Sequence, residues 1–361
     1  MNSELYKELA DVFIKIGFGG RHCPELYALL ESLFNEEEAK IALNLSPFGP
    51  EPPEKVAERM GEDPEKIARM LDVMADNGVI YCNQKGKEKW YKTIQLVPGI
   101  FELQFMKGEY TPRAKELAQL FDAYHNASID MAKKRTEPPK RMVSFARVIP
   151  IGESITPDTN IFSYEEVERY INQTDMITLS SCYCRHEHRL LDRGCEYPDD
   201  VCLQFGPFAR FVRDRGFGRE ITKEEAREVM KKSADAGLIS TSSNTRERID
   251  FICNCCTCCC GILRSVKISG APVRSVSSNF QAEVEADSCI GCGDCVERCQ
   301  MDAISLVDDI AQVDPERCLG CGVCVRACST EALTLVRRDD VEDPPRSFSE
   351  LIERQAQAAS S

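Results

Sequence analysis

The spacing of the cysteines is the feature that most constrains this chain. Twenty of its 361 residues are cysteine, too many to serve only as packing residues, and they are unevenly distributed. Two stand alone in the first third, ten lie between Cys182 and Cys260, and eight lie between Cys289 and Cys328. The chain therefore divides into a cysteine-poor first third, a cysteine-dense middle and a regular repeat near its end.

The repeat consists of two copies of one motif, C-x2-C-x2-C-x3-C. Three cysteines separated by two residues each wrap a glycine-containing loop, so that their thiolates point inward onto three irons of a cube. The fourth cysteine, which lies one helical turn after the third, points toward the other copy of the motif. Residues 302–307 and 331–336 follow the motifs at matching offsets, which predicts that a helix and a strand repeat as well. Structural zinc is the alternative, but it prefers two C-x2-C pairs at longer separation.

Residues 283–337 resemble the two-cluster bacterial-type ferredoxin domain. The resemblance implies an α+β fold with pseudo-twofold symmetry and one-electron transfer. In such domains the fourth cysteine of each motif ligates the partner cluster. The implied ligands are Cys289, Cys292, Cys295 and Cys328 for one 4Fe-4S cluster, and Cys318, Cys321, Cys324 and Cys299 for the other. The sequence departs from the usual pattern after each fourth cysteine, where Gln300 and Ser329 replace proline.

The ten middle cysteines form two groups. The first is Cys182, Cys184, Cys195 and Cys202, and the second is Cys253, Cys255, Cys256, Cys258, Cys259 and Cys260. Six cysteines within eight residues would be oxidised or bound to metal rather than packed as free thiols. Each group follows a predicted strand, at residues 176–180 and 249–253, so we expect loops that present thiolates at two strand ends.

Ten thiolates suffice for one or two further clusters. The simplest partition gives the first group to one cluster and four of the second group to another, while mixed sets and non-cubane clusters fit the same count. Zinc is the alternative for the first group, where His186 and His188 add ligands that zinc accepts. We prefer these histidines as donors to cluster sulfurs or as surface residues. Arg185 and Arg189 would neutralise an anionic cluster or form exposed salt bridges.

The N-terminal third predicts a winged helix-turn-helix. We expect helices over residues 36–45, 52–61 and 63–78, and then two strands around a turn at 83–87. The basic residues of this wing, which DNA phosphates would require, are Lys85, Lys87, Lys89 and Lys92. The many carboxylates of the same domain favour a protein-docking module instead. Residues 222–240 echo the helix, glycine turn and strand of this domain, which predicts a second winged-helix-like unit.

The expected fold class is α+β, with a winged-helix-like N-terminal domain, a cysteine-rich α/β middle domain and a C-terminal two-cluster ferredoxin-like domain. The expected boundaries are residues 1–132 for the first domain with a helical extension, 133–146 for a linker, 147–282 for the middle domain, 283–337 for the ferredoxin-like domain and 338–361 for a polar tail.

Composition and missing motifs exclude several functions. The formal net charge of −14 disfavours a dedicated nucleic-acid binder. No G-x-G-x-x-G opens a helix after a strand and no G-x4-G-K-[ST] occurs, so neither a dinucleotide fold nor a P-loop is indicated. No apolar run approaches the roughly 20 residues that span a bilayer, and no secretory signal begins the sequence. We expect a cytoplasmic protein with reduced thiols and no membrane insertion.

The whole pattern resembles cytoplasmic 4Fe-4S proteins of anaerobes with an N-terminal winged-helix-like part, a generic class of iron–sulfur oxidoreductases. The resemblance rests on C-Y-C-R-H from Cys182, on V-C-L-Q-F-G from Val201, on F-I-C-N-C-C from Phe251 and on the repeat that follows. It implies an oxidoreductase or electron-transfer subunit that passes single electrons to a redox partner protein or a reducible substrate. The alternative is a redox-sensing winged-helix transcription regulator.

Overall fold

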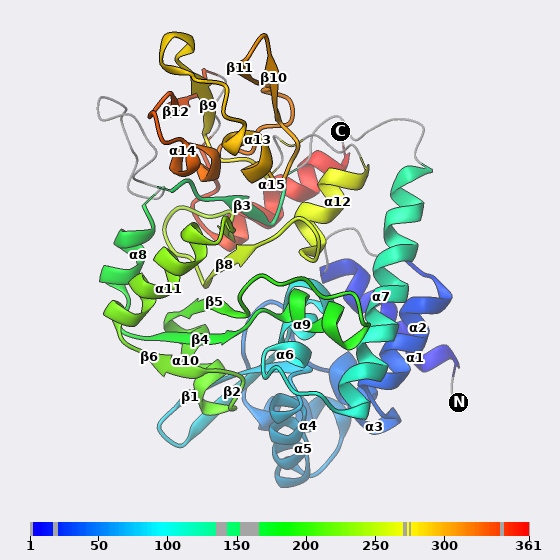
Figure 1. Cartoon of the computed structure of the whole chain (residues 1–361). Coiled ribbons are helices and arrows are strands. Elements are labelled where there is room, and N and C mark those ends of the chain that lie inside the picture. Colours follow the sequence, from blue (N-terminus) through cyan, green and yellow to red (C-terminus); the bar gives the residue numbers. More distant parts are fainter. Residues whose placement is uncertain are drawn as a thin grey trace. The chain divides into compact units, whose positions relative to one another are not determined.

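The computed structural model describes residues 3–16, 21–134, 143–151, 166–269, 273, 276–339 and 343–360 (Figure 1). The chain divides into two compact units. The first unit comprises Met1–Lys134, Ser180–Cys195 and Pro207–Arg219, and the second comprises Arg135–Leu179, Glu196–Gly206 and Glu220–Ser361. Both units combine helices and strands, so the α+β class is confirmed. The units join segments that are distant in sequence, and the contiguous domain boundaries expected above stay predictions. Residues 135–142 of the expected linker lie outside the described residues.

The first unit is mainly helical. Its helices are α1 (Ser3–Ile16), α2 (Pro24–Leu33), α3 (Glu36–Leu43), α4 (Pro53–Met60), α5 (Pro64–Asp76), α6 (Phe101–Phe105), α7 (Pro112–Lys133), α9 (Tyr183–Leu190) and most of α10 (Gly206–Asp214). A kinked segment, Leu96–Ile100, precedes α6. The strands β1 (Ile80–Lys85) and β2 (Glu88–Thr93) pair as an antiparallel hairpin.

The predicted helices α3, α4 and α5 are confirmed to within two residues at each end. Gly61 ends α4 in the left-handed conformation, at a φ of 66°, and the side chain of Asp63 accepts hydrogen bonds from the first backbone N–H groups of α5. The hairpin is tighter than expected. Lys85 pairs with Glu88, which leaves Gly86 and Lys87 as a two-residue turn. Gly86 has a φ of 63°, a conformation that such turns require and glycine adopts easily.

An aromatic cluster holds α9 against the rest of the first unit. Phe101, Phe105 and Phe121 are buried, and their rings meet edge to face at 5.1 to 5.8 Å between centroids. Tyr183 of α9 packs on Phe101 at 5.9 Å. Such contacts are worth about 1 kcal/mol each beyond the buried area. The cluster therefore attaches α9, which begins 50 positions after the end of α7, to α6 and α7.

A six-stranded sheet forms the core of the second unit. Its strand order is β3-β7-β8-β5-β4-β6, with the bounds β3 (Ala146–Val148), β7 (Ile239–Ser243), β8 (Phe251–Cys255), β5 (Asp200–Phe205), β4 (Ile177–Ser181) and β6 (Arg219–Ile221). The pairs β3/β7, β7/β8 and β5/β8 are antiparallel. The helices of this unit outside the cysteine repeat are α8 (Val167–Gln173), α11 (Lys223–Asp235), α12 (Gly261–Ser269) and α15 (Phe348–Ser360).

The prediction of a second winged-helix-like unit at residues 222–240 is wrong, although the helix and the strand of this segment are confirmed. Thr222 accepts a hydrogen bond from the backbone N–H of Glu225 at the start of α11, and Gly237 turns the chain into β7 at a φ of 79°. However, β7 lies between β3 and β8 in the six-stranded sheet. Every residue of β7 is buried, so this strand has two covered faces rather than the solvated face of a wing.

The cysteine repeat (residues 283–337) folds as two matching halves. Helix α13 (Asp294–Arg298) and strands β10 (Ile304–Val307) and β11 (Ile310–Val313) follow β9 (Phe280–Val284), and then come α14 (Val323–Ala327) and β12 (Leu333–Arg337). Strand β9 pairs with β12 and β10 pairs with β11, both antiparallel. Asp302 and Glu331, three residues after the last cysteine of each motif, both have a positive φ, of 52° and 56°. The predicted repetition of helix and strand is therefore confirmed.

Glycines set the tight course of each motif loop. Gly291 and Gly320 occupy equivalent positions with φ values of 66° and 64°. A Cβ atom on Gly291 would lie 2.4 Å from the carbonyl oxygen of Asp309, and one on Gly320 would lie 2.0 Å from that of Phe280. No side chain fits at either distance, so the loops keep these positions as glycine.

The expected polar tail contains a helix. In α15, Leu351 is fully buried, and the side chain of Gln355 donates a hydrogen bond of 2.8 Å to the carbonyl of Val143. The tail is thus packed beside the start of β3 within the second unit. Among the described residues, no helix is both long enough and apolar enough to cross a membrane.

Candidate metal centres

Four cysteines of the repeat line one cavity, which we call the inner site: Cys299, Cys318, Cys321 and Cys324. Three of them come from the second motif and Cys299 comes from the first. Apolar side chains complete the wall, including Leu319, Val323 and Leu335 of the repeat and Ile239 of β7. The cavity therefore offers four sulfur ligands in largely apolar surroundings.

Burial and backbone donors act in opposite directions on the thiols of the inner site. Burial raises the pKa of Cys321 to about 12 and the pKa of Cys324 well above its ordinary value. Without metal these thiols are protonated at neutral pH, so binding of a cation has to release their protons. The backbone N–H of Gly320 points at the sulfur of Cys318 at 3.4 Å, and that of Ala303 points at Cys299 at 3.3 Å. Such donors stabilise thiolates and tune a cluster.

The remaining four cysteines of the repeat, Cys289, Cys292, Cys295 and Cys328, form what we call the outer site. Cys292 is exposed and Cys295 is buried. The backbone N–H of Ala311 lies 3.5 Å from the sulfur of Cys289. Burial raises the pKa of Cys328. Hydrogen bonding with Thr330 and with backbone N–H groups lowers this pKa by more than burial raises it, so that the pKa lies below its ordinary value. The outer site is more open to solvent than the inner site.

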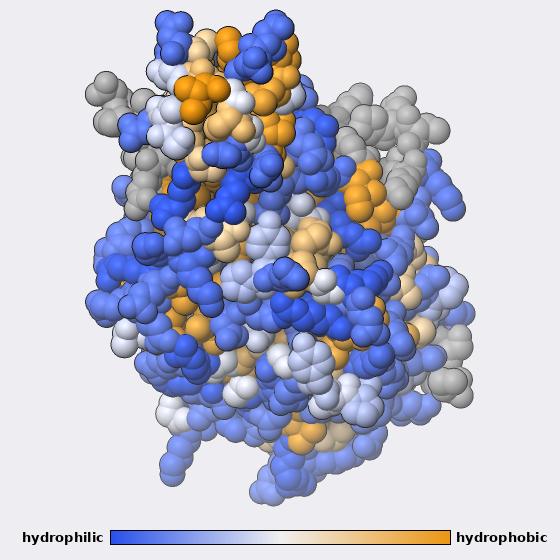
Figure 2. All heavy atoms as spheres, in the orientation of Figure 1, coloured by the Kyte–Doolittle hydropathy of each residue, from blue (hydrophilic) through white to orange (hydrophobic). Residues whose placement is uncertain are grey.

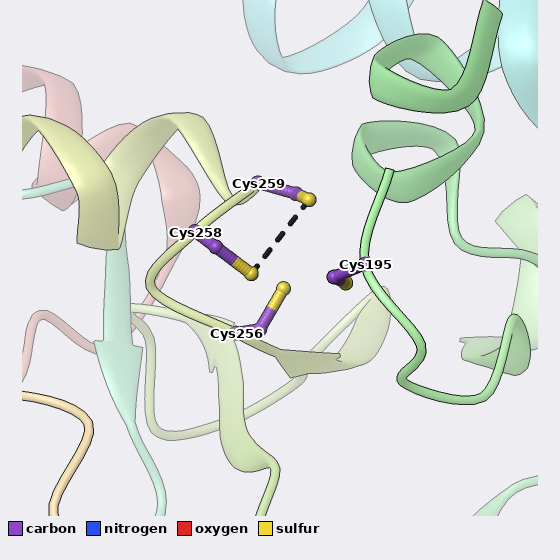
Figure 3. A group of neighbouring side chains, drawn as sticks. All are labelled: Cys195, Cys256, Cys258 and Cys259. Carbon is purple, nitrogen blue, oxygen red and sulfur yellow. Dashed lines mark hydrogen bonds between the residues drawn. The ribbon is translucent and has the colours of Figure 1, made fainter. Parts of the chain in front are cut away.

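A third group of thiols lies in the turn after β8, which we call the cysteine loop (residues 256–260). The sulfurs of Cys256, Cys258 and Cys259 all lie within 4.8 Å of one another, and those of Cys258 and Cys259 are 3.8 Å apart (Figure 3). Metal–sulfur bonds of about 2.3 Å at tetrahedral angles place two thiolates of one metal at about this separation. Sharing of hydrogen bonds with Cys256 and Cys258, together with burial, raises the pKa of Cys259. The loop thus offers three converging sulfurs to a metal.

The other cysteines of the second group lie elsewhere. The expected loop begins later than predicted, because β8 continues through Cys255. Cys253 and Cys255 alternate along the strand with Asn254, whose amide donates to the carbonyl of Val201 at 2.8 Å. The sulfur of Cys255 lies 3.4 Å from the hydroxyl of Thr241 on β7. The structure thus brings together three of the six predicted ligands of this group and places Cys253 and Cys255 within the sheet.

The first middle group is spread over both units. Cys182, Cys184 and Cys195 belong to the first unit, and Cys202 lies buried in β5 of the second unit. The prediction of a loop after β4 is wrong, because Cys182 immediately precedes α9 and Cys184 lies within this helix. The carbonyl of Cys182 accepts a hydrogen bond from the backbone N–H of His186, which starts the helical ladder. Shared ligation by this group stays a prediction.

The polar residues from Arg185 to His188 of α9 are buried, which contradicts a surface role for the two histidines, whereas Arg189 is half-buried. His186 and His188 are 4% and 6% exposed, and Arg185 is fully buried. One ring nitrogen of His186, Nε2, lies 2.9 Å from the carbonyl oxygen of Glu109 and donates to it. Nδ1 of His188 lies 2.8 Å from a carboxylate oxygen of Glu187. Desolvation lowers the pKa of His186. Both imidazoles thus have partners within the first unit.

The lysines of the predicted wing are only partly free to contact DNA. Nζ of Lys89 lies 2.7 Å from the carboxylate of Asp72, and Nζ of Lys92 lies 5.5 Å from the ring centre of Tyr81. Lys85 and Lys87 are exposed. On α5, the helix that would enter the groove, the basic side chains pair with acidic ones: Lys66 with Glu62 and Arg69 with Glu65. This surface lacks the basic stripe that DNA binding requires.

Comparison with known proteins identifies the repeat. Residues 288–332 match the family described as 4Fe-4S dicluster domain. No curated protein and no solved structure is significantly similar to the chain. The chain therefore contains an iron–sulfur domain that binds 4Fe-4S clusters, and the converging thiols of the cysteine loop add a further candidate metal centre.

Proposed function

We propose that the protein transfers single electrons through two 4Fe-4S clusters, one at the inner site and one at the outer site. The observation that supports this most strongly is the apolar cavity lined by Cys299, Cys318, Cys321 and Cys324, with backbone N–H groups directed at two of the sulfurs. The ligand sets are those implied by the ferredoxin resemblance, in which each motif lends its fourth cysteine to the other site.

A 4Fe-4S cluster, when bound, supplies reversible one-electron reduction with little change in geometry. The chain's own residues do the rest. The thiolates hold the irons, the N–H groups of Gly320, Ala303 and Ala311 donate to sulfurs, and the apolar wall of the inner site keeps water out. Together these groups set the potential at which each site accepts an electron.

The surface at the outer site suits electron entry from a partner protein. Ile290, Leu306 and Val307 are exposed apolar side chains of the first motif and the β10–β11 hairpin. Figure 2 shows apolar surface at the top of the view, where Figure 1 places these strands. Exposed carboxylates flank them, at Asp294, Glu297 and Asp308. We propose a redox partner whose docking patch is apolar at its centre and basic at its rim.

The cysteine loop is proposed to hold a further iron centre. Its three converging thiolates leave at least one ligand to come from outside the loop, and the cysteines of the first group are the candidates: Cys182, Cys184, Cys195 and Cys202. Zinc is the alternative metal, because it accepts the same tetrahedral thiolates. If this centre keeps an open position, the protein acts as an oxidoreductase on a small molecule.

A cytoplasmic location completes the proposal, because so many reduced thiols need a reducing compartment. The regulator alternative is not favoured. Lys89 is neutralised by Asp72, the basic residues of α5 are paired, and one cluster would suffice to sense redox state. The N-terminal helices and hairpin are instead proposed to dock the protein to another subunit.

The test is a metal count on the full chain purified without air. We expect about eight irons with as many sulfides from the repeat, and about twelve or more irons in total if the cysteine loop is loaded. Cys321→Ser should lower the iron content by roughly half of the repeat's share, whereas Cys23→Ser, which changes an isolated cysteine, should leave it unchanged. A colourless protein with zinc in the repeat would refute the proposal.

A further inference from the structure

Gln300 is the residue that stands where ferredoxin domains usually carry proline, and it makes a contact that proline could not. Its backbone follows Cys299, a proposed ligand of the inner site. The side-chain Nε2 donates to the carbonyl of Gly237, in the turn between α11 and β7, at 2.5 Å. The side-chain Oε1 accepts a hydrogen bond of 2.9 Å from the backbone N–H of Thr257. Gln300 therefore joins the cysteine repeat to the sheet.

Thr257 lies between two of the converging thiols of the cysteine loop, Cys256 and Cys258. Besides its N–H, its hydroxyl donates to the backbone carbonyl of Gln300 at 3.1 Å. The two residues are thus linked by a pair of hydrogen bonds, one through the side chain and one through the backbone of Gln300. Gln300 is bonded through the backbone to Cys299, and Thr257 is bonded through the backbone to Cys256 and Cys258. We propose all three cysteines as metal ligands.

Charged contacts fix the same junction. Nζ of Lys267, on α12, lies 2.7 Å from the backbone carbonyl of Gln300 and 2.9 Å from the carboxylate of Asp302. Arg298 donates to the backbone carbonyl of Asp235, and Arg326 pairs with the carboxylate of the same residue. All these residues belong to the second unit. The backbone on both sides of Cys299 is therefore held on the sheet and the cysteine loop.

The equivalent position in the other half of the repeat shows that the contact is not a general property of the motif. Ser329 follows Cys328 of the outer site just as Gln300 follows Cys299. It is exposed, and its side chain has no hydrogen-bond partner among the residues that the structure describes. The repeat therefore uses one of its two equivalent positions to reach the cysteine loop and leaves the other in solvent.

We propose that the connection Cys299–Gln300···Thr257 is the route by which an electron passes between the inner cluster and the metal centre of the cysteine loop. In this step the inner cluster is oxidised by one electron and the iron of the loop is reduced by one, with no bond made or broken and no proton transferred. Electron tunnelling is faster along covalent and hydrogen bonds than across gaps. The inference rests on the proposed function, because it requires iron in the loop.

The experiment compares full-length Gln300→Ala with the matched variant Ser329→Ala, both loaded with iron and sulfide without air. Rapid mixing with dithionite and freeze-quenching at increasing times, followed by electron paramagnetic resonance, gives the rate at which the loop iron is reduced after the repeat clusters. We expect Gln300→Ala to slow this step about tenfold, equivalent to about 1.4 kcal/mol in activation free energy, and Ser329→Ala to leave it unchanged.

Two further variants separate a route from a merely structural clamp. Gln300→Met fills the space of the side chain without its two hydrogen bonds and should be as slow as Gln300→Ala. Thr257→Val removes only the hydroxyl bond and should slow the step less than Gln300→Ala does. Thr257→Val also decides the matter if Gln300→Ala does not fold. Equal rates in the wild type and all variants would overturn the proposal, as would a slower step explained by a shifted potential of the inner cluster. Absence of loop iron in the wild type would instead overturn the proposed iron centre of the cysteine loop.

Discussion

Gly320 and Gly86 have nearly the same backbone conformation, with φ values of 64° and 63°, but very different surroundings. An added Cβ on Gly320 would lie 2.0 Å from the carbonyl oxygen of Phe280, whereas one on Gly86 would meet no atom within 4 Å. We predict that Gly86→Ala costs only the conformational penalty of about 1 to 2 kcal/mol. Gly320→Ala should cost about 3 kcal/mol or more, because the motif loop has to shift.

Thermal unfolding of the iron-loaded protein and its iron content check this prediction. The Gly320→Ala protein should lose iron from the inner site, because Gly320 also directs its N–H at Cys318. The Gly86→Ala protein should keep its full iron content. Equal losses in the two variants would contradict the argument.

Asp72 is a second residue whose effect follows from its partners. Its carboxylate accepts hydrogen bonds from Lys89, Tyr91 and Arg215, at 2.7 to 2.9 Å. Burial raises the pKa of Asp72, but these bonds together lower it below its ordinary value. A group whose folded pKa is lowered stabilises the fold above its unfolded pKa of about 3.9, and this stabilisation is lost as the pH falls through the folded pKa.

Asp72→Asn should therefore destabilise the protein by about 2 kcal/mol at pH 7, and the difference from the wild type should shrink as the pH falls below about 4. Urea unfolding of both proteins across this pH range measures the effect. Asp214→Asn, which removes an exposed pair with Arg213, is the control and should change the free energy of unfolding by less than about 0.5 kcal/mol. A difference at pH 3 as large as the difference at pH 7 would contradict the assignment.

Single residues also mark the limit of what the sequence can predict. The departure from proline at Gln300 is visible in the sequence, but its partner Thr257 is 43 residues away and is not signalled by any motif. The same holds for Asp72 and Arg215, which are separated by 143 residues. Local spacing predicts ligands within one loop, whereas contacts between distant segments depend on the packing of the whole unit.

At the scale of elements, the helix α9 explains why one prediction failed. Arg185, His186, Glu187 and His188 are four consecutive polar residues, and all of them are buried. Polar residues are mostly exposed in proteins, so the sequence favours a surface loop here and does not indicate a buried helix. In contrast, α5 has a capping aspartate, an initial proline and a terminal glycine turn, and its bounds were predicted closely.

The hairpin of β1 and β2 exposes only part of the basic surface that a DNA-binding wing would need. With Lys89 and Lys92 engaged within the first unit, only Lys85 and Lys87 of the four wing lysines are exposed. In a mobility-shift assay at low salt we expect no sequence-selective DNA binding, with either reduced or oxidised protein. Any weak shift should disappear in the double variant Lys85→Glu, Lys87→Glu. Selective binding that follows the redox state would instead favour the regulator.

At the scale of the whole molecule, the net charge of −14 governs association with charged partners. We predict that reduction by a cationic donor, such as a reduced viologen, slows as ionic strength rises from about 10 mM to 500 mM, because salt screens the attraction. An anionic donor should show the opposite trend. Stopped-flow bleaching of the iron–sulfur absorbance measures both rates, and identical salt dependence for the two donors would exclude steering by the acidic surface.

The cysteine repeat could be predicted from spacing, because all eight ligands lie within 40 residues and two motifs, and the resemblance to ferredoxin domains supplied their division between two sites. The middle cysteines could not be assigned in the same way. Cys253 and Cys255 belong to a strand, Cys184 to a helix, and only Cys256, Cys258 and Cys259 converge within one loop. The assignment of such ligands depends on tertiary structure, since their spacing matches no single loop geometry.

The unequal burial of Cys292 and Cys324 determines the order in which the two clusters of the repeat are reduced. The cluster of the outer site would lie near water, which stabilises the extra negative charge of the reduced form. The cluster of the inner site would lie against apolar side chains, which do not stabilise this charge. Stepwise addition of reductant should then give two resolved waves instead of one, with the solvent-facing half filling first. Two halves with the same motif would then hold electrons at different energies, because their surroundings differ.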